Sequence, residues 1–190
     1  MPAYSVRMTG VLTEATAERV VLLGPDREPV GTQLKSEVHG VDTPLHLAFS
    51  CYVFDDADRL LMTRRALGKR TWPGVWTNTC CGHPAPGEDM TDAIGRRLLT
   101  ELGLQVDVLT CALHDFAYRA VDASGVVENE FCPVYTARAL HPDASVTANA
   151  AEVMDWRWVP WDDLVAAAGR TPFAFSPWAV QQVMLLPPRS

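Results

Sequence analysis

Three histidines and two closely spaced glutamates are the side chains of this sequence best suited to holding a metal ion. His39, His46 and His83 are spread over the first half of the chain, and one residue separates Glu128 from Glu130. Alternate residues of a strand face the same side, so the two carboxylates can converge on one site. Imidazole and carboxylate ligands together suit a borderline divalent ion such as Zn or Mn. Spacing alone leaves open that the histidines are structural and that the glutamates end a solvated strand.

A thiol two residues before His83 is the second group that could do chemistry. If this segment is extended, Cys81 and His83 face one side and Cys80 faces the other. An ordinary thiol is largely protonated near neutral pH, so Cys81 can donate a proton. We expect Cys80 to be a small buried side chain. The five cysteines are odd in number and irregularly spaced, which favours reduced thiols over a disulfide scaffold.

A glycine-led segment, residues 82–104, carries acidic and basic side chains at helical spacing. Seven of its residues follow a fixed pattern: Gly82, Glu88, Arg96, Leu98, Glu101, Gly103 and Leu104. The pattern resembles the Nudix box, whose helix carboxylates hold divalent cations against a diphosphate, and such hard cations want several oxygen ligands. Arg97 and Thr100 replace two of those carboxylates and leave Glu101. From the helix alone, a surface salt bridge between Arg97 and Glu101 is an equal alternative.

Four further segments occur in a fixed order along the chain: residues 39–50 (HGVDTPLHLAFS), 72–84 (WPGVWTNTCCGHP), 127–130 (VENE) and 175–178 (FSPW). With the altered box, they resemble the type I isopentenyl-diphosphate isomerases of the Nudix superfamily over residues 20–185. The resemblance implies one divalent ion, Mn, Zn or Mg, with these ligands: His39, His46, His83, Glu128 and Glu130. It also implies a Mg ion on the substrate diphosphate, held by Glu101 and the Cys81 carbonyl.

The same resemblance implies the catalytic groups. They are Cys81, Glu130, Tyr118 and Trp178. Isomerases of this family move a double bond by adding a proton at one carbon and removing another elsewhere, so two proton-transfer groups are needed. Cys81 and Glu130 match these groups, one on each face of the substrate, and which one adds the proton stays open. The indole face of Trp178 would attract a carbocation. Without the resemblance, core packing is the better interpretation of Trp178, and Tyr118 is explained as a half-buried strand residue with a hydrogen-bonded hydroxyl.

A diphosphate needs cations, and four positions match phosphate-binding residues of the family: Lys35, Arg65, Lys69 and Arg97. Arginine gives bidentate contacts to phosphate. Arg64 would face the other side of a strand from Arg65 and is therefore a control. Without the resemblance, a solvated basic edge over residues 64–70 is as good an interpretation.

Three functions are compatible with these residues. The first is isomerisation of isopentenyl diphosphate to dimethylallyl diphosphate. The second is a Nudix hydrolase acting on a nucleoside diphosphate derivative, against which Arg97 and Thr100 count. The third is a non-catalytic module stabilised by a metal, which gives Cys81, Tyr118 and Trp178 no common purpose.

The elements that must position these groups can be read from apolar runs and turn residues. Strands are predicted at 20–23, 30–35, 47–54, 59–64, 106–113, 131–137 and 152–159, with a hairpin turn at Asp55 and Asp56. A helix is predicted from Gly87 and Glu88 to Leu102, ended by Gly103. Shorter helices are predicted at 161–168 and at 178–185, the last with Ser176 as its N-cap and Pro177 at its first turn.

These elements indicate the α+β class, with a mixed, Nudix-like sheet flanked by helices. Residues 1–18 are interpreted as an extension and 19–190 as a single isomerase domain. The chain has 190 residues, a formal charge of -7 and 48% hydrophobic residues, without an apolar run long enough for a membrane span. It shows no secretory signal. We therefore expect a cytoplasmic monomer that acts on a small isoprenoid diphosphate and binds neither nucleic acid nor a membrane.

Overall fold

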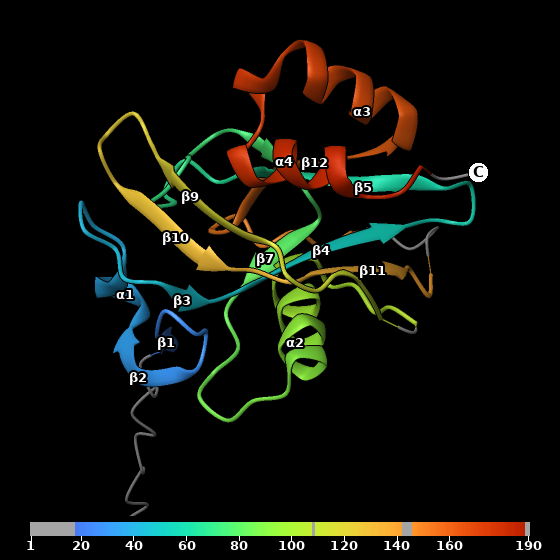
Figure 1. Ribbon diagram of the computed structural model, residues 1–190. Coiled ribbons are helices and arrows are strands. Elements are labelled where there is room, and N and C mark those ends of the chain that lie inside the picture. Colours follow the sequence, from blue (N-terminus) through green and yellow to red (C-terminus); the bar gives the residue numbers. More distant parts are fainter. Residues whose placement is uncertain (1–17, 108, 142–145, 189–190) are drawn as a thin grey trace, which may run out of the picture.

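The computed structural model describes residues 18–107, 109–141 and 146–188, whose strands form two sheets (Figure 1). The smaller sheet has the order β2 (Pro29–Leu34), β1 (Arg19–Leu23), β3 (His46–Leu47), β10 (Val127–Phe131) and β9 (Ala117–Val121). The larger has the order β12 (Val153–Pro160), β5 (Arg59–Arg65), β4 (Phe49–Phe54), β11 (Val134–Arg138) and β8 (Thr110–Leu113). Two short strands are added to the larger sheet, β6 (Trp76–Thr77) beside β5 and β7 (Cys80–Gly82) beside β4.

Two runs of chain pass from the smaller sheet into the larger one. β3 continues into β4 after Ala48, and β10 continues into β11 after Cys132 and Pro133. The two runs are parallel to each other in both sheets, so His46 pairs with Glu130 and Ser50 with Val134. The strands predicted at 47–54 and 131–137 are confirmed over β4 and β11, but each run is divided between the two sheets, which the sequence does not predict. A proline cannot donate to a strand ladder, which suits a break at Pro133.

The larger sheet lies between α2 (Met90–Leu102) on one side and α3 (Trp161–Arg170) with α4 (Pro177–Leu185) on the other (Figure 1). Strand β4 is buried on both faces, and its residues alternate between two hydrophobic clusters. Phe49, Cys51 and Val53 pack in the cluster that contains α2. Tyr52 and Phe54 pack in the cluster that contains α3 and α4. The period of two along a strand thus builds both layers from one segment. The predicted α+β class with mixed sheets is confirmed, with two sheets in place of one.

The helix of the glycine-led segment begins later than the sequence predicts. Asp89 caps α2 by accepting a 2.8 Å hydrogen bond from the backbone of Thr91. Gly87 has a φ of 79° and lies in the preceding loop. The predicted end is correct, because Gly103 adopts a left-handed φ of 66°. Ser176 also caps α4 as predicted.

Other differences lie near the smaller sheet. A short helix, α1 (Lys35–Val38), follows β2, so Lys35 is helical and does not end a strand. The sequence does not predict β9, and the strand expected at 106–113 begins only at Thr110. Residues 1–17, most of the predicted extension, lie outside the described residues, and a short 3-10 turn, η1 (Pro172–Ala174), precedes α4.

The predicted hairpin of β4 and β5 is present, and its strands separate soon after the turn. Asp55 accepts backbone hydrogen bonds from Ala57 and Arg59 in the turn. Only Phe54 and Leu60 pair directly. Beyond them β7 pairs with β4 and β6 pairs with β5. Because the two hairpin strands separate, β4 is free to pair with β7, the strand that carries Cys81.

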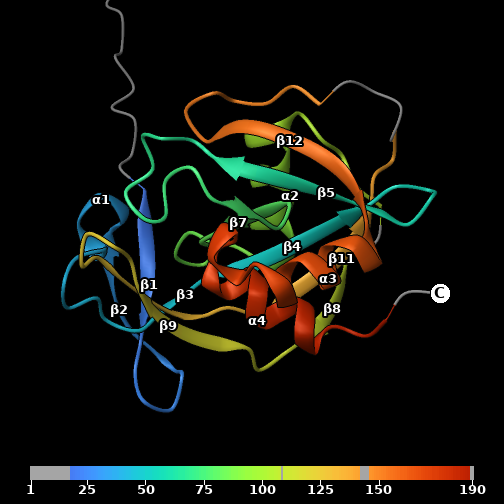
Figure 2. The same ribbon diagram turned by 90° about the horizontal axis from the view of Figure 1, so that it is seen from above.

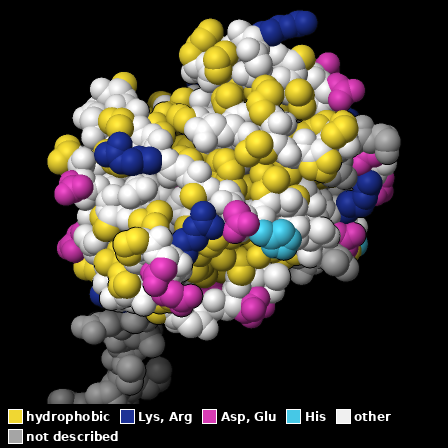
Figure 3. Space-filling model, in the orientation of Figure 1, with side chains coloured by type: hydrophobic (Ala, Val, Ile, Leu, Met, Phe, Trp, Pro, Cys, Tyr) yellow, Lys and Arg dark blue, Asp and Glu magenta, His cyan; other side chains and the backbone are white. Residues whose placement is uncertain are grey.

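The view from above shows α1, β1, β2, β3 and β9 gathered at one end, beside the larger sheet (Figure 2). Charged side chains on the face seen in Figure 3 stand singly or in small groups among hydrophobic and uncharged ones. No described helix has the length and apolar character needed to cross a membrane.

Candidate active site and metal centre

Four predicted metal ligands meet where the β3, β7 and β10 segments converge. His46 lies on β3, Glu130 on β10, His83 directly after β7, and His39 after α1. One ligand atom from each lies within 4.8 Å of the others. The Nδ1 atom of His46 is 2.9 Å from the Pro44 carbonyl oxygen. Because a carbonyl can only accept, Nδ1 carries the proton and Nε2 is free to ligate.

The buried atoms of this cluster fit a divalent ion. His39 Nε2, His46 Nε2 and Glu128 Oε2 are buried and make no well-directed hydrogen bond, although His39 Nε2 is 2.9 Å from Glu128 Oε2 and His46 Nε2 is 3.5 Å from Glu130 Oε1. Such atoms are costly unless something pairs with them, and a cation at this point would do so. Burial lowers the pKa of His83 to about 4, which keeps the imidazole neutral, as a metal ligand must be. The described residues therefore form a buried His3Glu site that can hold a metal ion.

Glu128 lies at the edge of this cluster. Its Oε2 atom is 2.9 Å from His39 Nε2, and its Oε1 atom accepts a 2.6 Å hydrogen bond from the Thr71 hydroxyl. Glu101, the sixth predicted ligand, lies apart from the cluster and pairs with Arg97 on α2. The structure thus brings together four of the six and sets Glu128 beside them.

The two oxygens of Glu130 face different groups. Oε1 is 3.1 Å from His83 Nε2, and Oε2 accepts a 2.9 Å hydrogen bond from the Tyr118 hydroxyl. The pairing of β9 with β10 places Tyr118 directly opposite Glu130. Burial opposes ionisation of Glu130, but the neighbouring imidazoles of His46 and His83 hold the pKa of its carboxyl well below the usual value. Glu130 can therefore ligate with one oxygen and act chemically through the other.

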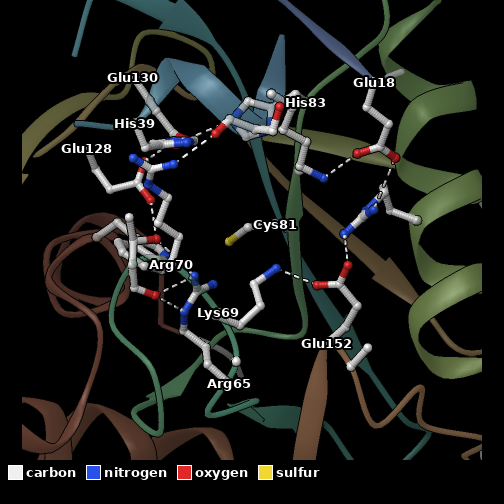
Figure 4. Close-up of a pocket in the computed structure, with 18 of the residues that line it drawn as sticks. Glu18, His39, Arg65, Lys69, Arg70, Cys81, His83, Glu128, Glu130 and Glu152 are labelled. Carbon is white, nitrogen blue, oxygen red and sulfur yellow. Dashed lines mark hydrogen bonds and ion pairs between the residues drawn. The ribbon is translucent and has the colours of Figure 1, made fainter. Parts of the chain in front are cut away.

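A cavity of about 520 Å³ opens beside the cluster and contains Cys81 in its wall (Figure 4). Glu130, Tyr118 and Trp178 line the same cavity. Burial raises the pKa of the Cys81 thiol to about 11, so it is protonated near neutral pH. The prediction that Cys81 and His83 face one side is confirmed, since both line the cavity. Cys80 packs on the opposite side, in the cluster of α2.

Aromatic rings cover one side of the cavity. The centroid of Trp178 is 5.6 Å from that of Tyr118 and 5.5 Å from that of Trp72. The Trp178 side chain is buried, and α4 carries it. The guanidinium carbon of Arg65 lies 5.3 Å above its ring. This wall is apolar and can attract positive charge, so it suits a cationic intermediate shielded from water.

All four predicted phosphate-binding cations line the cavity: Lys35, Arg65, Lys69 and Arg97. Each already has partners. Lys35 is 2.6 Å from Glu18, Lys69 pairs with Glu152, and Arg97 contacts Glu152 and Glu101.

The two neighbouring arginines of β5 differ in direction, as predicted. The Arg65 guanidinium donates to the Thr71 and Trp72 carbonyls. Arg64 donates to the Gly74 carbonyl and is absent from the cavity wall.

Two residues of the glycine-led segment, Glu88 and Arg96, form an ion pair with each other. Arg96 donates to both carboxylate oxygens of Glu88, at 2.7 and 2.8 Å, and Glu88 also accepts from the backbone of Ala85. Thr100 donates to the Arg96 carbonyl one turn earlier. Among the described box residues, Glu101 is the one buried carboxylate, so α2 is poor in the acids that a diphosphate hydrolase needs.

Sequence reasoning missed several residues of the site. Thr71 and Glu152 contact predicted site residues, and Arg70 also lines the cavity. Asn78 accepts a hydrogen bond from Cys81. Their types and spacing carry no motif of their own. The only signal is position, since Thr71 and Asn78 lie within or next to the segment around Trp72 that the resemblance singled out.

Comparisons with known proteins agree with this geometry. The NUDIX domain family matches residues 44–179. A protein of Frankia alni named isopentenyl-diphosphate Delta-isomerase is 61% identical over 167 residues, covering 87% of this chain and 84% of that protein. One of Mycolicibacterium vanbaalenii with the same name is 58% identical over 174 residues, covering 90% and 92%.

Solved structures show the same fold at low identity. A Deinococcus radiodurans protein superposes with a TM-score of 0.68 and 18% identity, covering 88% of this chain and 98% of that one. A MutT protein from Methanosarcina mazei gives a TM-score of 0.57 and 15% identity, covering 76% and 94%.

Proposed function

The chain belongs to the isopentenyl-diphosphate Delta-isomerase family, with a Nudix domain, and from this we propose that its cavity converts isopentenyl diphosphate to dimethylallyl diphosphate. A proton is added to the terminal alkene carbon, and another leaves the carbon on the far side of the resulting tertiary centre. The two steps balance, so the reaction needs neither an oxidant nor a reductant. The observation that carries the proposal is that a thiol and a carboxylate line one aromatic-walled cavity.

We assign the proton transfers to Cys81 and Glu130. Both groups line the cavity and both can exchange a proton, so one can protonate the alkene and the other can remove a proton from the cation. Tyr118 holds the Glu130 oxygen that faces it, at 2.9 Å. The Trp178 ring supports the positive charge between the two steps. Which of Cys81 and Glu130 acts first stays open.

The metal ligands proposed are His39, His46, His83, Glu128 and Glu130. A divalent ion there, Mn, Zn or Mg, would supply positive charge that fixes and polarises the carboxylate of Glu130. The buried Nε2 atoms of His39 and His46, which make no well-directed hydrogen bond, support this assignment. We further propose that Glu101 and the Cys81 carbonyl hold Mg on the diphosphate, since Mg needs few protein ligands when phosphate oxygens are present.

The diphosphate would bind Lys35, Arg65, Lys69 and Arg97. Glu18, the partner of Lys35, and Glu152, the partner of Lys69, are the carboxylates that an incoming phosphate would replace. A flexible ammonium such as that of Lys35 or Lys69 can exchange one anionic partner for another with little loss.

A Nudix hydrolase is the second candidate, because the NUDIX family match covers the box. The two activities are separated by incubating the protein with Mg and Mn and either isopentenyl diphosphate or a nucleoside diphosphate derivative, with a chelator in a control sample, and recording proton and phosphorus NMR spectra. We expect dimethylallyl signals with the diphosphate intact. Phosphate released from the nucleoside derivative without any allylic product would favour the hydrolase, and unchanged isopentenyl diphosphate would contradict the isomerase.

We also propose that residues 19–190 act as one domain, in the cytoplasm and as a monomer. The mass in solution, measured by light scattering at the concentration of the assay, tests the last point. A mass of twice 20.9 kDa would contradict it.

A further inference from the structure

A buried amide behind the cavity connects two of the proposed catalytic residues. Asn78 lies between β6 and β7, and its side chain is 1% exposed. Its Oδ1 atom is 3.1 Å from Cys81 Sγ and 3.2 Å from the indole nitrogen of Trp178. The indole nitrogen can only donate, so Oδ1 is the acceptor for both. One oxygen therefore holds a thiol on β7 and an indole on α4, which are far apart in sequence.

The orientation of this amide is fixed from its other end. Nδ2 donates to the carbonyls of Cys51, at 3.1 Å, and Cys80, at 2.8 Å. Turning the amide over would place an oxygen against those carbonyl oxygens and a nitrogen against the donors. A third donor, the hydroxyl of Thr77, reaches Oδ1 at 2.8 Å. Every polar atom of the Asn78 side chain is thus occupied, and the amide can adopt one orientation.

The sulfur of Cys81 is held from a second side. Ser50 Oγ lies 3.4 Å from Cys81 Sγ. Ser50 Oγ in turn accepts a 2.9 Å hydrogen bond from Gln182, whose carbonyl oxygen accepts one from Tyr52. Ser50, Tyr52 and Gln182 are fully buried. Ser50 Oγ lies equally close to Cys132 Sγ, at 3.4 Å, and either atom of each Ser50 contact can be the donor, whereas Asn78 Oδ1 can only accept from Cys81.

We propose that Asn78 is a positioning residue for the isomerisation, whose side-chain oxygen holds the Cys81 thiol and the Trp178 indole in a fixed relation to the cavity. The inference rests on the proposed function. It adds that the proton of Cys81 is directed at Asn78 until substrate is bound, and that the thiol and the aromatic face are set by one group. Because proton transfer to carbon depends steeply on geometry, this group should affect turnover and leave substrate affinity alone.

The test compares Asn78→Ala with Thr79→Val in protein whose wild-type isomerase activity has first been established. Thr79 is the matched control, because it is buried in the same segment and its hydroxyl bridges the Val53 amide and the Leu61 carbonyl, away from the cavity. We expect Asn78→Ala to lower kcat about 100-fold, with KM and bound metal unchanged. Thr79→Val is expected to lower Tm and keep the wild-type kcat. A kcat of Asn78→Ala equal to that of Thr79→Val overturns the proposal.

The double variant Asn78→Ala/Trp178→Phe tests whether the two residues act together. Trp178→Phe keeps an aromatic ring and removes the indole N–H. If Asn78 acts partly through Trp178, the two effects on kcat overlap, and the double variant loses less than the product of the single losses. A loss equal to that product contradicts the connection.

A spectroscopic measurement keeps the proposal testable if Asn78→Ala does not fold. The S–H stretching band of Cys81 is identified in the infrared spectrum of the native protein as the band missing from Cys81→Ala. We expect it at the lowered frequency of a hydrogen-bonded thiol. A band at the frequency of a free thiol overturns the proposal.

Discussion

Glu130 can serve both as a ligand and as a proton-transfer group because its two oxygens face different partners. The histidines occupy the side of Oε1, and the Tyr118 hydroxyl fixes Oε2 at 2.9 Å. A carboxylate has about four acceptor positions, so neither contact exhausts it. The Cys81 thiol in the wall of the same cavity is held in a comparable way, by Asn78 and Ser50. Each proposed proton-transfer group is therefore oriented by a neighbour to which we assign no proton transfer.

The adjacent cysteines should respond differently to truncation. We expect Cys81→Ala to lower kcat by about 100-fold or more without loss of fold, because a methyl group cannot transfer a proton. Cys80→Ala should keep turnover and lower the free energy of unfolding by about 1 kcal/mol, since a buried thiol is lost from the packing against α2. Steady-state kinetics and urea unfolding measure the two effects.

An alkylating substrate analogue gives the matching control for the cysteine pair. It should label Cys81, and saturating substrate should prevent the reaction. Label on Cys80, detected by mass spectrometry, or wild-type turnover of Cys81→Ala, would refute the assignment.

Thr71 should influence the metal through Glu128. Its hydroxyl donates to Glu128 Oε1 at 2.6 Å and so directs Oε2 toward His39. We expect Thr71→Val, which keeps the shape of the side chain, to weaken metal affinity about 10-fold. Thr71→Ser retains the hydroxyl and should bind metal as the native protein does. Competition against a chromophoric chelator measures both, and equal affinity of Thr71→Val and the native protein would contradict this role.

At the scale of elements, helix α2 carries the Nudix box with Arg97 in place of a carboxylate, which suits the proposed diphosphate site. Arg97 faces Glu101, Glu152 and Glu18 from the side of α2 that borders the cavity. The Arg97 guanidinium pairs with these carboxylates, and it can pair with phosphate oxygens when substrate binds. The Glu88–Arg96 pair joins the loop before α2 to the helix itself.

Reversal of charge at Arg97 should therefore act on substrate binding. Arg97→Glu adds a carboxylate to a group of three, next to the proposed diphosphate position. We expect KM to rise about 10-fold or more, by repulsion of like charges. Arg64→Gln, on the opposite side of β5 from Arg65, is the control and should keep the native KM. Circular dichroism establishes that Arg97→Glu is folded, and an unchanged KM in folded protein would remove Arg97 from the phosphate site.

The sequence predicts those elements whose signals are local and misses those set by partners far along the chain. The ends of α2 and α4 follow from Gly103 and Ser176, whose capping preferences depend on a few neighbouring atoms. The division of the β10–β11 run at Pro133 depends on which sheet each half joins, and no local pattern contains that information. β9 is missed for the same reason, since its pairing with β10 defines it.

The residues of the site likewise fall into those that the sequence predicts and those that it does not. Metal ligands and the parity of Cys81 with His83 could be inferred from residue type, strand period and family resemblance. Thr71, Asn78 and Glu152 could not, because an ordinary polar residue gains its role only from the atom that it meets in space.

At the scale of the molecule, the metal cluster joins segments from both sheets. His46 and Glu130 come from the smaller sheet, His83 follows a strand of the larger one, and His39 follows α1. A bound ion would thus add to global stability as well as to the site. Binding to the folded state alone stabilises it by roughly 3 kcal/mol at a free metal concentration about 100 times Kd.

Strong chelation should therefore abolish activity and lower Tm together. The buried ligands of the cluster, two of whose nitrogens make no well-directed hydrogen bond, would lose their cation. Addition of Mn or Zn with Mg should restore both activity and Tm. Calorimetry with elemental analysis checks this expectation, and full activity in protein shown to be metal-free would refute the metal centre.

The parallel runs β3–β4 and β10–β11 have a consequence for the order of folding. They pair across about 80 residues of chain, so their meeting closes a long loop at an entropic cost of roughly 4 kcal/mol. Contacts of this range form late. His46 and Glu130 are themselves one of the pairs, so the cluster comes into existence at that same step. Nascent or partly folded chains consequently hold only scattered ligands and compete poorly for scarce metal, which goes to finished molecules.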